Sequence, residues 1–138
     1  MFIVKFSEEE GEIKITEMQK EILFMRSSVI SNFLDDDNTI LIPKYVSRES
    51  FVHILHFIDI CPADFDHNFS KPIDKNEFHR KAYLFENWIN SMKKDVLFNL
   101  LNSANYLIID SLIDLLCAYI AIKIKYMSNE EMSDYFTI

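Results

Sequence analysis

The sequence almost lacks glycine: Gly11 is the single one in 138 residues. Loops that bind phosphate need several glycines, because their backbone N–H groups must approach the phosphate closely. A nucleophile elbow likewise needs small residues around its serine. Neither motif is present, so the sequence indicates no nucleotide-binding loop and no hydrolase of the elbow type.

Cysteine is also scarce, and Cys61 and Cys117 are the only two. Two cysteines do not make a disulfide framework, and the opening MFIVKFSEEE has neither the basic segment nor the cleavage site of a secretory signal. We therefore expect reduced thiols and a cytoplasmic and nuclear location. The apolar neighbours of Cys117 would raise its pKa, so we predict a small core residue rather than a nucleophile.

Positive charge is in deficit, with 14 Lys and Arg against 22 Asp and Glu and a formal net charge of −8. Such a chain repels phosphate, which argues against nucleic acid and anionic membranes as partners. The acidic runs at residues 8–10 and 35–37 lack the alternating carboxylates and central glycine of a calcium loop. We interpret both as solvated turns.

A long apolar run without charge is missing as well. Residues 107–124 approach one, but Asp110 and Asp114 would each cost about 2.5–3.5 kcal/mol at the centre of a bilayer. Lys123 and Lys125 end the run. We therefore interpret it as a helix of a soluble protein.

A few residue types could bind zinc: His53 and His56 are three residues apart, and Cys61 and His67 follow. No CxxC pair, no HExxH and no second pair of ligands accompanies them. We predict ordinary histidines, no cofactor and no metal, and an enzyme or zinc protein stays as a remote alternative.

Alternating apolar residues predict a β-hairpin over residues 2–16, with Gly11 where the turn needs a positive φ. Over residues 18–34 the apolar period changes to three or four, which predicts one helix with a buried stripe. That stripe consists of Met18, Ile22, Met25, Val29 and Phe33, joined by Ile30 and Leu34. Alternation returns over residues 39–46, where Pro43 must lie either at the end of the predicted strand or on a strand at the edge of the sheet.

Ser47 is placed to cap a further helix, which ends before Pro62. Its predicted buried stripe is Phe51, Ile54, Leu55 and Ile58. Residues 63–77 have no sustained period and contain turn formers, so we predict a surface excursion. A weaker helical period then resumes, with Phe78, Leu84, Trp88 and Ile89 as expected anchors.

Three more helices are predicted, over residues 94–107, 110–125 and 129 to the end. Ser128 and Glu131 form a capping-box pattern before the last one. The order of elements predicts an α+β domain, in which a small sheet packs on a cluster of helices.

The helix over residues 110–125 is apolar on almost every side. One broad side contains Leu112, Leu115, Leu116, Tyr119 and Ile122, and a second stripe contains Ile113, Cys117, Ile120 and Ile124. Such a helix lies either at the centre of its own protein or between its protein and a partner. The periodicity leaves both possibilities open.

The stretch LFNLLNSANYLIIDSLIDLLCAYIAIKIKYMSNEEMSDYFTI, which begins at Leu97, resembles the Skp family (S-phase kinase-associated proteins), the small adaptors of SCF-type ubiquitin ligases. It follows the family pattern LFxLxxAANYLxIxxLLDxxC and then xxEEIRxxFNI. The matching residues are Leu97, Phe98, Leu100, Ala104, Asn105, Tyr106, Leu107, Leu112, Asp114, Cys117, Glu130, Glu131, Phe136 and Ile138. Upstream, FIVKFSEEEGEIKIT is similar to the opening hairpin of the family, so the resemblance spans nearly the whole chain.

The resemblance implies a BTB/POZ fold, a small three-stranded sheet with packed helices, followed by C-terminal adaptor helices. It implies no enzymatic activity and two protein partners, a cullin and F-box proteins, bridged for ubiquitin-dependent degradation. In this family the NYL turn faces the cullin, which points to Asn105 and Tyr106. The implied F-box-binding residues are Ile113, Cys117, Ile120, Ile124, Phe136 and Ile138.

The same resemblance implies four segments. Residues 1–62 form the first half of the BTB/POZ fold, 63–77 the excursion, 78–109 its C-terminal helices with the cullin-facing turn, and 110–138 the F-box-binding helices, truncated relative to the family. Ser111 departs from the family pattern, which often has glycine at this position.

Two other readings stay open beside this one. An elongin-C-like cullin adaptor shares the fold but ends soon after its corresponding turn. A self-associating BTB scaffold, with a homodimer when free, would need no second partner.

Overall fold

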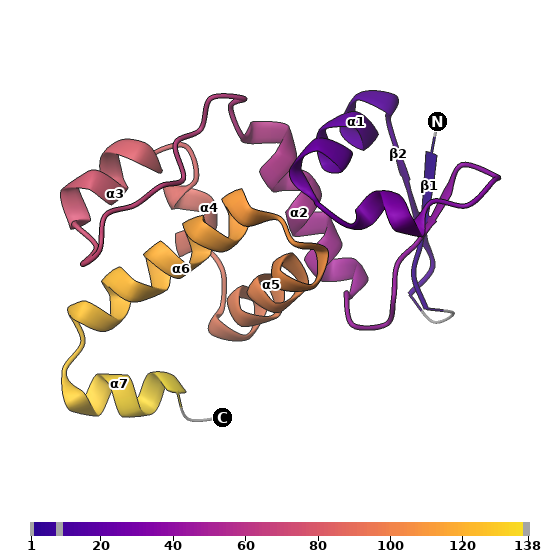
Figure 1. Cartoon of the computed structure of the whole chain (residues 1–138). Helices are drawn as coiled ribbons and strands as arrows, with labels where there is room; N and C mark the ends of the chain where they lie inside the picture. The colour runs from indigo at the N-terminus through magenta and orange to yellow at the C-terminus, as the bar shows by residue number, and fades with distance from the viewer. Residues whose placement is uncertain (1, 8–9, 137–138) are drawn as a thin grey trace.

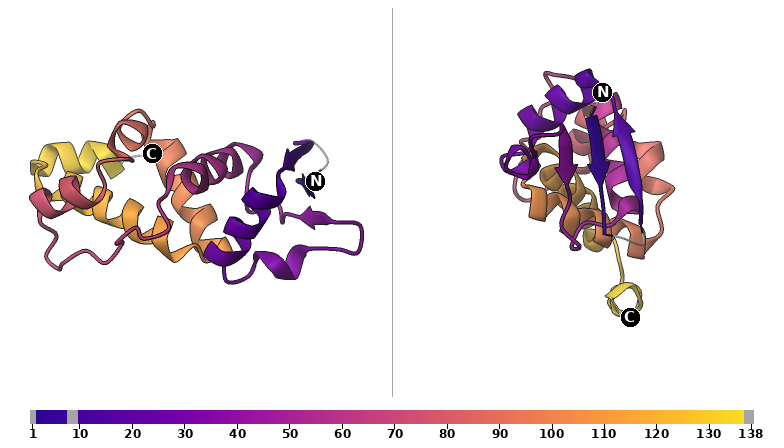
Figure 2. Two further views of the ribbon diagram at one scale, coloured as in Figure 1. Left: turned by 90° about the horizontal axis from the view of Figure 1, so that it is seen from above. Right: turned by 90° about the vertical axis from the view of Figure 1, so that its right-hand side faces the viewer.

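The computed structural model describes residues 2–7 and 10–136. Its sheet has three strands in the order β2-β1-β3, formed by β1 (Phe2–Lys5), β2 (Glu12–Ile15) and β3 (Thr39–Leu41). β1 pairs antiparallel with β2 and parallel with β3. The right-hand view of Figure 2 shows the three strands side by side in front of the helices.

The predicted hairpin is confirmed. Val4 pairs with Ile13 on one side and with Ile40 on the other, and its side chain is fully buried. Gly11 has a φ of 77°, which a residue with a side chain rarely adopts. β3 is an edge strand that ends before Pro43, as predicted.

The single helix predicted over residues 18–34 is wrong. The structure has α1 (Glu17–Arg26) and, after a break, a short 3-10 helix, η1 (Ile30–Phe33). The break occurs at Ser27, whose hydroxyl donates to the carbonyl of Leu107 and accepts from the N–H of Ile30. A buried serine bonded across 80 residues of sequence ends the helix where periodicity would continue it.

The predicted buried stripe of this segment is correct in part. Ile30 is fully buried, and Ile22, Val29, Phe33 and Leu34 are half-buried. Met18 and Met25, however, are 71% and 68% exposed, and Leu23 is fully buried instead. α1 packs against α2 (Arg48–Ile60), so its buried face is centred on Leu23.

The core is built on α2 and on two long helices, α5 (Lys94–Leu107) and α6 (Asp110–Lys125). α5 packs against both α2 and α6 (Figure 1). Ser47 caps α2 by accepting from the N–H of Ser50, as predicted. The predicted α2 stripe is buried, and Phe57 adds a stack on Phe85 with ring centroids 5.3 Å apart.

Two short helices, α3 (Lys75–Lys81) and α4 (Glu86–Asn90), lie between α2 and α5. α3 begins inside the predicted excursion, because Asp74 caps it by accepting from the N–H of Asn76. Of the predicted anchors here, Leu84 is exposed, and the adjacent Phe85 is the fully buried residue. No helix among the described residues is long and apolar enough to cross a membrane.

The last helix, α7 (Asn129–Phe136), projects from the body at the end of α6 (Figures 1 and 2). Ser128 and Glu131 exchange the two hydrogen bonds of a capping box, as predicted. The predicted α+β class is thus confirmed, and a small three-stranded sheet with packed helices and further C-terminal helices is consistent with a BTB-like fold.

Candidate partner-binding surfaces

α6 has one side in the core and another side facing outward. Leu112, Leu115 and Leu116 are fully buried. On the second stripe Cys117 is exposed, Ile113 and Ile124 are half-buried, and Ile120 retains 9% exposure. We call these four residues the α6 stripe.

Cys117 is therefore not the core residue that its neighbours predict. Those neighbours, Leu116 and Ala118, are buried on adjacent sides of the helix, whereas the thiol points outward. Partial burial, together with the nearby Asp114 carboxylate, raises the pKa of Cys117 against a smaller opposing effect of Lys71. The thiol thus stays protonated and apolar at neutral pH, which suits a contact residue better than a nucleophile.

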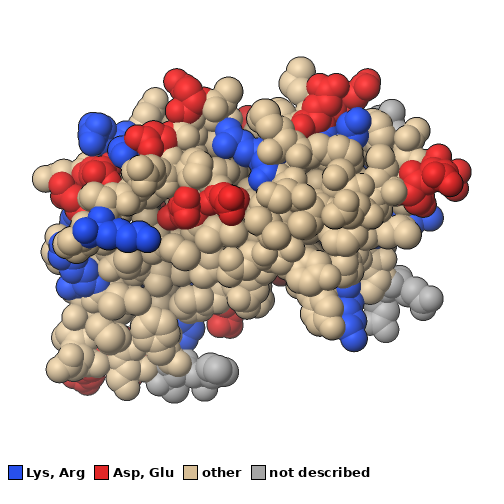
Figure 3. Space-filling view, in the orientation of Figure 1, with Lys and Arg blue, Asp and Glu red and all other residues tan. Residues whose placement is uncertain are grey.

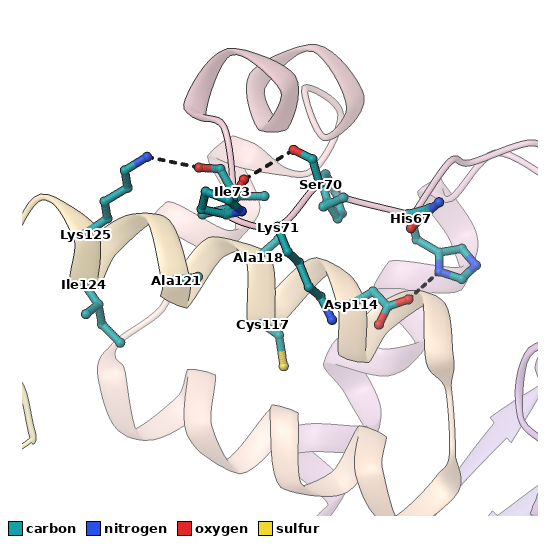
Figure 4. Close-up of a pocket in the computed structure, with 13 residues that line it drawn as sticks. His67, Ser70, Lys71, Ile73, Asp114, Cys117, Ala118, Ala121, Ile124 and Lys125 are labelled. Atoms are coloured by element: carbon teal, nitrogen blue, oxygen red, sulfur yellow. Dashed lines mark hydrogen bonds and ion pairs between the residues drawn. The ribbon is translucent and has the colours of Figure 1, made fainter.

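A groove of about 940 Å³ runs along α6 beside the stripe. Its other side is the chain between α2 and α3, and we call residues 65–73 the strap. Figure 4 shows the strap running along α6, with Cys117, Ala121 and Ile124 on the helix below it. Asp114, Ala118 and Lys125 complete the helical side of the groove.

The strap is pinned to the helices at both ends. His67 Nδ1 lies 2.7 Å from the Asp114 carboxylate, and Lys125 Nζ donates to the carbonyl of Ile73 over 3.2 Å. Lys81 Nζ on α3 also contacts the Asp66 carboxylate at 2.9 Å and donates to the carbonyl of Asn68 at 2.8 Å.

Aromatic contacts hold the strap as well. Phe65 packs edge-on against Phe85 with centroids 5.0 Å apart, and Phe69 lies 5.6 Å from Phe78. The predicted excursion is thus packed against the body. Sequence periodicity could not reveal this, because the partners lie on other elements.

A second surface lies where α5 ends. Asn105 and Tyr106 are in its last turn, both exposed, Tyr106 by 40%. The chain turns at Ile108, which has a φ of 52° and closes the helix. The Tyr106 ring lies 5.5 Å from the ring of Tyr45, an exposed residue between β3 and α2.

Tyr45 is not among the residues predicted from the sequence, although an aromatic residue in the IPKYV segment, close to a proline, is a candidate for a surface contact. We call Tyr45, Asn105 and Tyr106 the tyrosine surface. Figure 1 shows α6 running from this end of α5 toward the opposite end of the molecule, so the groove and the tyrosine surface occupy different regions.

The remaining F-box-binding candidates lie at the chain end. Phe136 is half exposed and its ring lies 6.2 Å from that of Phe98 on α5. Ile138 lies outside the described residues.

The zinc candidates have other roles. His53 accepts a hydrogen bond from Trp88 Nε1 at 3.3 Å, and burial lowers its pKa. His67 pairs with Asp114. The described His, Cys, Asp and Glu residues include no group of three that could hold a metal ion.

Charge is distributed unevenly on the face in Figure 3. Acidic and basic side chains gather along its upper edge and at its left end, and acidic side chains form a further group at its right end. Between them lies an area with few charged side chains.

Two comparisons with known proteins agree. The model of the Skp1 family, dimerisation domain, matches residues 110–138. A curated relative, the S-phase kinase-associated protein 1 homolog of Tetrahymena thermophila, is 30% identical over 131 residues, which cover 92% of this chain and 78% of the relative. The chain belongs to the Skp1 family. The resemblance noted in the sequence is thereby confirmed.

Membership of the Skp1 family supports, at the level of the family, an adaptor role in SCF ubiquitin ligases. The segment matched by the family model is α6 and α7, the part that contains the α6 stripe and one side of the groove. The adaptors of the Skp1 family are non-catalytic, and the surfaces described above offer contact residues.

Proposed function

We propose that this chain is a non-catalytic adaptor that bridges a cullin N-terminal domain to F-box substrate receptors. The tyrosine surface binds the cullin, and the α6 stripe with Phe136 and Ile138 binds the F-box. The complex acts in the cytoplasm and nucleus.

This proposal rests on the difference in burial between the two sides of α6. The apolar character of Leu112, Leu115 and Leu116 is explained by their burial in the core. The core does not explain why the outward stripe is also apolar, since Cys117 is exposed and Ile124 is only half-buried. Apolar residues beside an open groove are typical of a surface that a partner covers. Since α6 also packs against α5, a partner on the stripe is held rigidly relative to the body.

The tyrosine surface supports the cullin side. Tyrosine contributes a large apolar ring and a polar tip, which suits the centre of an interface. Tyr106 and Tyr45 present two neighbouring rings outside the core. Family membership agrees with a cullin as the partner.

The F-box side is tested by Cys117→Asp, because Cys117 is the most accessible residue of the stripe. Ile120 is a poorer choice, since at 9% exposure a charge there would also damage the core. We expect Cys117→Asp to weaken F-box binding by about 2 kcal/mol or more, since it places a charge in a desolvated contact. Isothermal titration calorimetry with a purified F-box domain measures this.

Val52→Asp is the matched control, because Val52 is an exposed apolar residue on α2. It should leave F-box affinity unchanged. Equal affinity of the Cys117→Asp variant and the unaltered chain would remove the stripe from the interface. Absence of F-box binding by the unaltered chain would overturn the bridging function itself.

A further inference from the structure

The groove beside the α6 stripe has a floor of small side chains. Ala118, Ala121 and Cys117 line it along α6. Small residues in a helix surface leave a depression that a large side chain of a facing element can fill. Here the strap closes one side of the depression (Figure 4).

The rim of the groove is charged in a way that favours an acidic partner. Its charged side chains are Lys71, Lys125 and Asp114. The Asp114 carboxylate is engaged with His67 and Lys125 Nζ with a backbone carbonyl. None of the ion pairs between described residues involves Lys71, whose side chain reaches across α6 toward Cys117 (Figure 4).

An available lysine over an apolar groove is notable in a chain of net charge −8. A carboxylate brought beside Lys71 would gain an ion pair where its surroundings are partly apolar. Charge complementarity thus argues for an occupant that is apolar and carries an acidic side chain.

The groove is continuous with the α6 stripe. Cys117 and Ile124 belong to both, and Ala121 lies beside them on the same helix. A partner seated on the stripe therefore borders the groove directly. This continuity assigns the groove to the partner that binds the stripe.

We propose that the strap groove extends the F-box-binding surface and selects among F-box proteins. It favours those whose docking helix places a bulky apolar side chain over Ala118 and Ala121 and a carboxylate beside Lys71. The inference rests on the proposed function and adds the strap as the element that determines specificity.

Two variants test the groove without touching the stripe. Ala121→Trp fills it, and because Ala121 is exposed the fold tolerates the larger side chain. Lys71→Glu reverses the charge at its rim. Lys14→Glu, on the exposed face of β2 at the other end of the molecule, is the control with the same change of charge.

Each variant is titrated by calorimetry against one purified F-box domain, and its thermal midpoint is measured alongside. We expect Ala121→Trp to lower the affinity about tenfold or more, as for a blocked anchor site. Lys71→Glu should lower it about threefold to fivefold, as for a rim ion pair. Lys14→Glu should change it by less than about twofold, a surface substitution remote from the contact.

The acidic residue of the partner is found by changing each Asp and Glu of the F-box helices in turn to Asn or Gln. One such change should remove the effect of Lys71→Glu, which identifies a coupled pair. Binding of all variants with the affinity of the unaltered chain would overturn the role of the groove and leave the bridging function intact. Failure of the unaltered chain to bind any F-box domain would overturn both.

Discussion

The body of the molecule and α7 are held in different ways. Residues of the sheet, α1, α2, α5 and α6 share one continuous core, in which most of the large apolar side chains are inaccessible. None of the described residues of α7 is buried. The body is therefore stabilised by its own buried core, whereas α7 is attached to it through partly exposed side chains.

Contacts of α7 with the body include aromatic and cation–π pairs. Tyr135 lies 5.7 Å from the ring of Phe98, and Lys123 Nζ lies 5.4 Å from the ring of Tyr135. The Tyr135 hydroxyl is buried without a hydrogen-bond partner among the described atoms, and burial raises its pKa. An unpaired buried hydroxyl weakens this attachment further.

The largest expected effect is in the body. Phe57→Ala should lower the free energy of unfolding by about 3–5 kcal/mol, since it opens a cavity between Phe85 and Trp88. Urea denaturation followed by circular dichroism measures it. Phe136→Ala is the control in α7 and should cost less than about 1 kcal/mol. Similar losses of unfolding free energy in both variants would contradict the difference in burial between the body and α7.

Tyr106→Ala sharpens the comparison, because Tyr106 belongs to the body but lies outside its core. We expect cullin affinity to fall by about 2 kcal/mol or more, as at an interface anchor. The thermal midpoint should hardly change, since the lost contact is with the exposed ring of Tyr45. A large fall in the midpoint would show that the tyrosine is a structural residue.

Phe98→Ala tests the attachment of α7. Because Phe98 contacts both Tyr135 and Phe136, its removal should release α7 at a cost of about 1 kcal/mol in global stability. Hydrogen exchange should then become fast in residues 129–136 and stay slow in α5. Protection of α7 that persists in the variant would mean that other contacts hold it.

The smallest effect concerns pH. Burial lowers the pKa of His53 below the ordinary histidine value of about 6.5. The nearby Glu49 carboxylate opposes this shift, and His56 adds to it. Between the folded and unfolded pKa values the unfolded chain binds more protons, so stability falls as the pH drops below about 6.5. His53→Gln should flatten the pH profile of the thermal midpoint between pH 7 and pH 5. If the thermal midpoint of the variant depends on pH as steeply as that of the unaltered chain, the pH dependence comes from groups other than His53.

The sequence predicts the elements that depend on local pattern. The bounds of α5 and α6 agree with the periodicity, and the caps at Ser47 and Ser128 form as expected. Prediction from the sequence fails where contacts between residues far apart in the chain determine the local structure. Ser27 ends α1 because its hydroxyl bonds to Leu107, a partner that no local window contains.

The candidate surfaces, too, could be predicted from the sequence only in part. The helical periodicity supplied the α6 stripe and the resemblance supplied Tyr106. Exposure within the stripe depends on packing, which leaves Cys117 outside the core and Ile120 inside it. Tyr45 joins Tyr106 through the fold alone. The strap becomes part of a groove through contacts with distant residues, such as that of His67 with Asp114, 47 residues further along the chain.

Simultaneous binding of two partners tests the central claim most directly. The purified chain is mixed with a cullin N-terminal domain and an F-box domain, and the mass of the product is measured by size-exclusion chromatography with light scattering. The bridging account predicts one complex that contains one copy of each protein. Displacement of one partner by the other, or a chain that pairs only with itself, would contradict it.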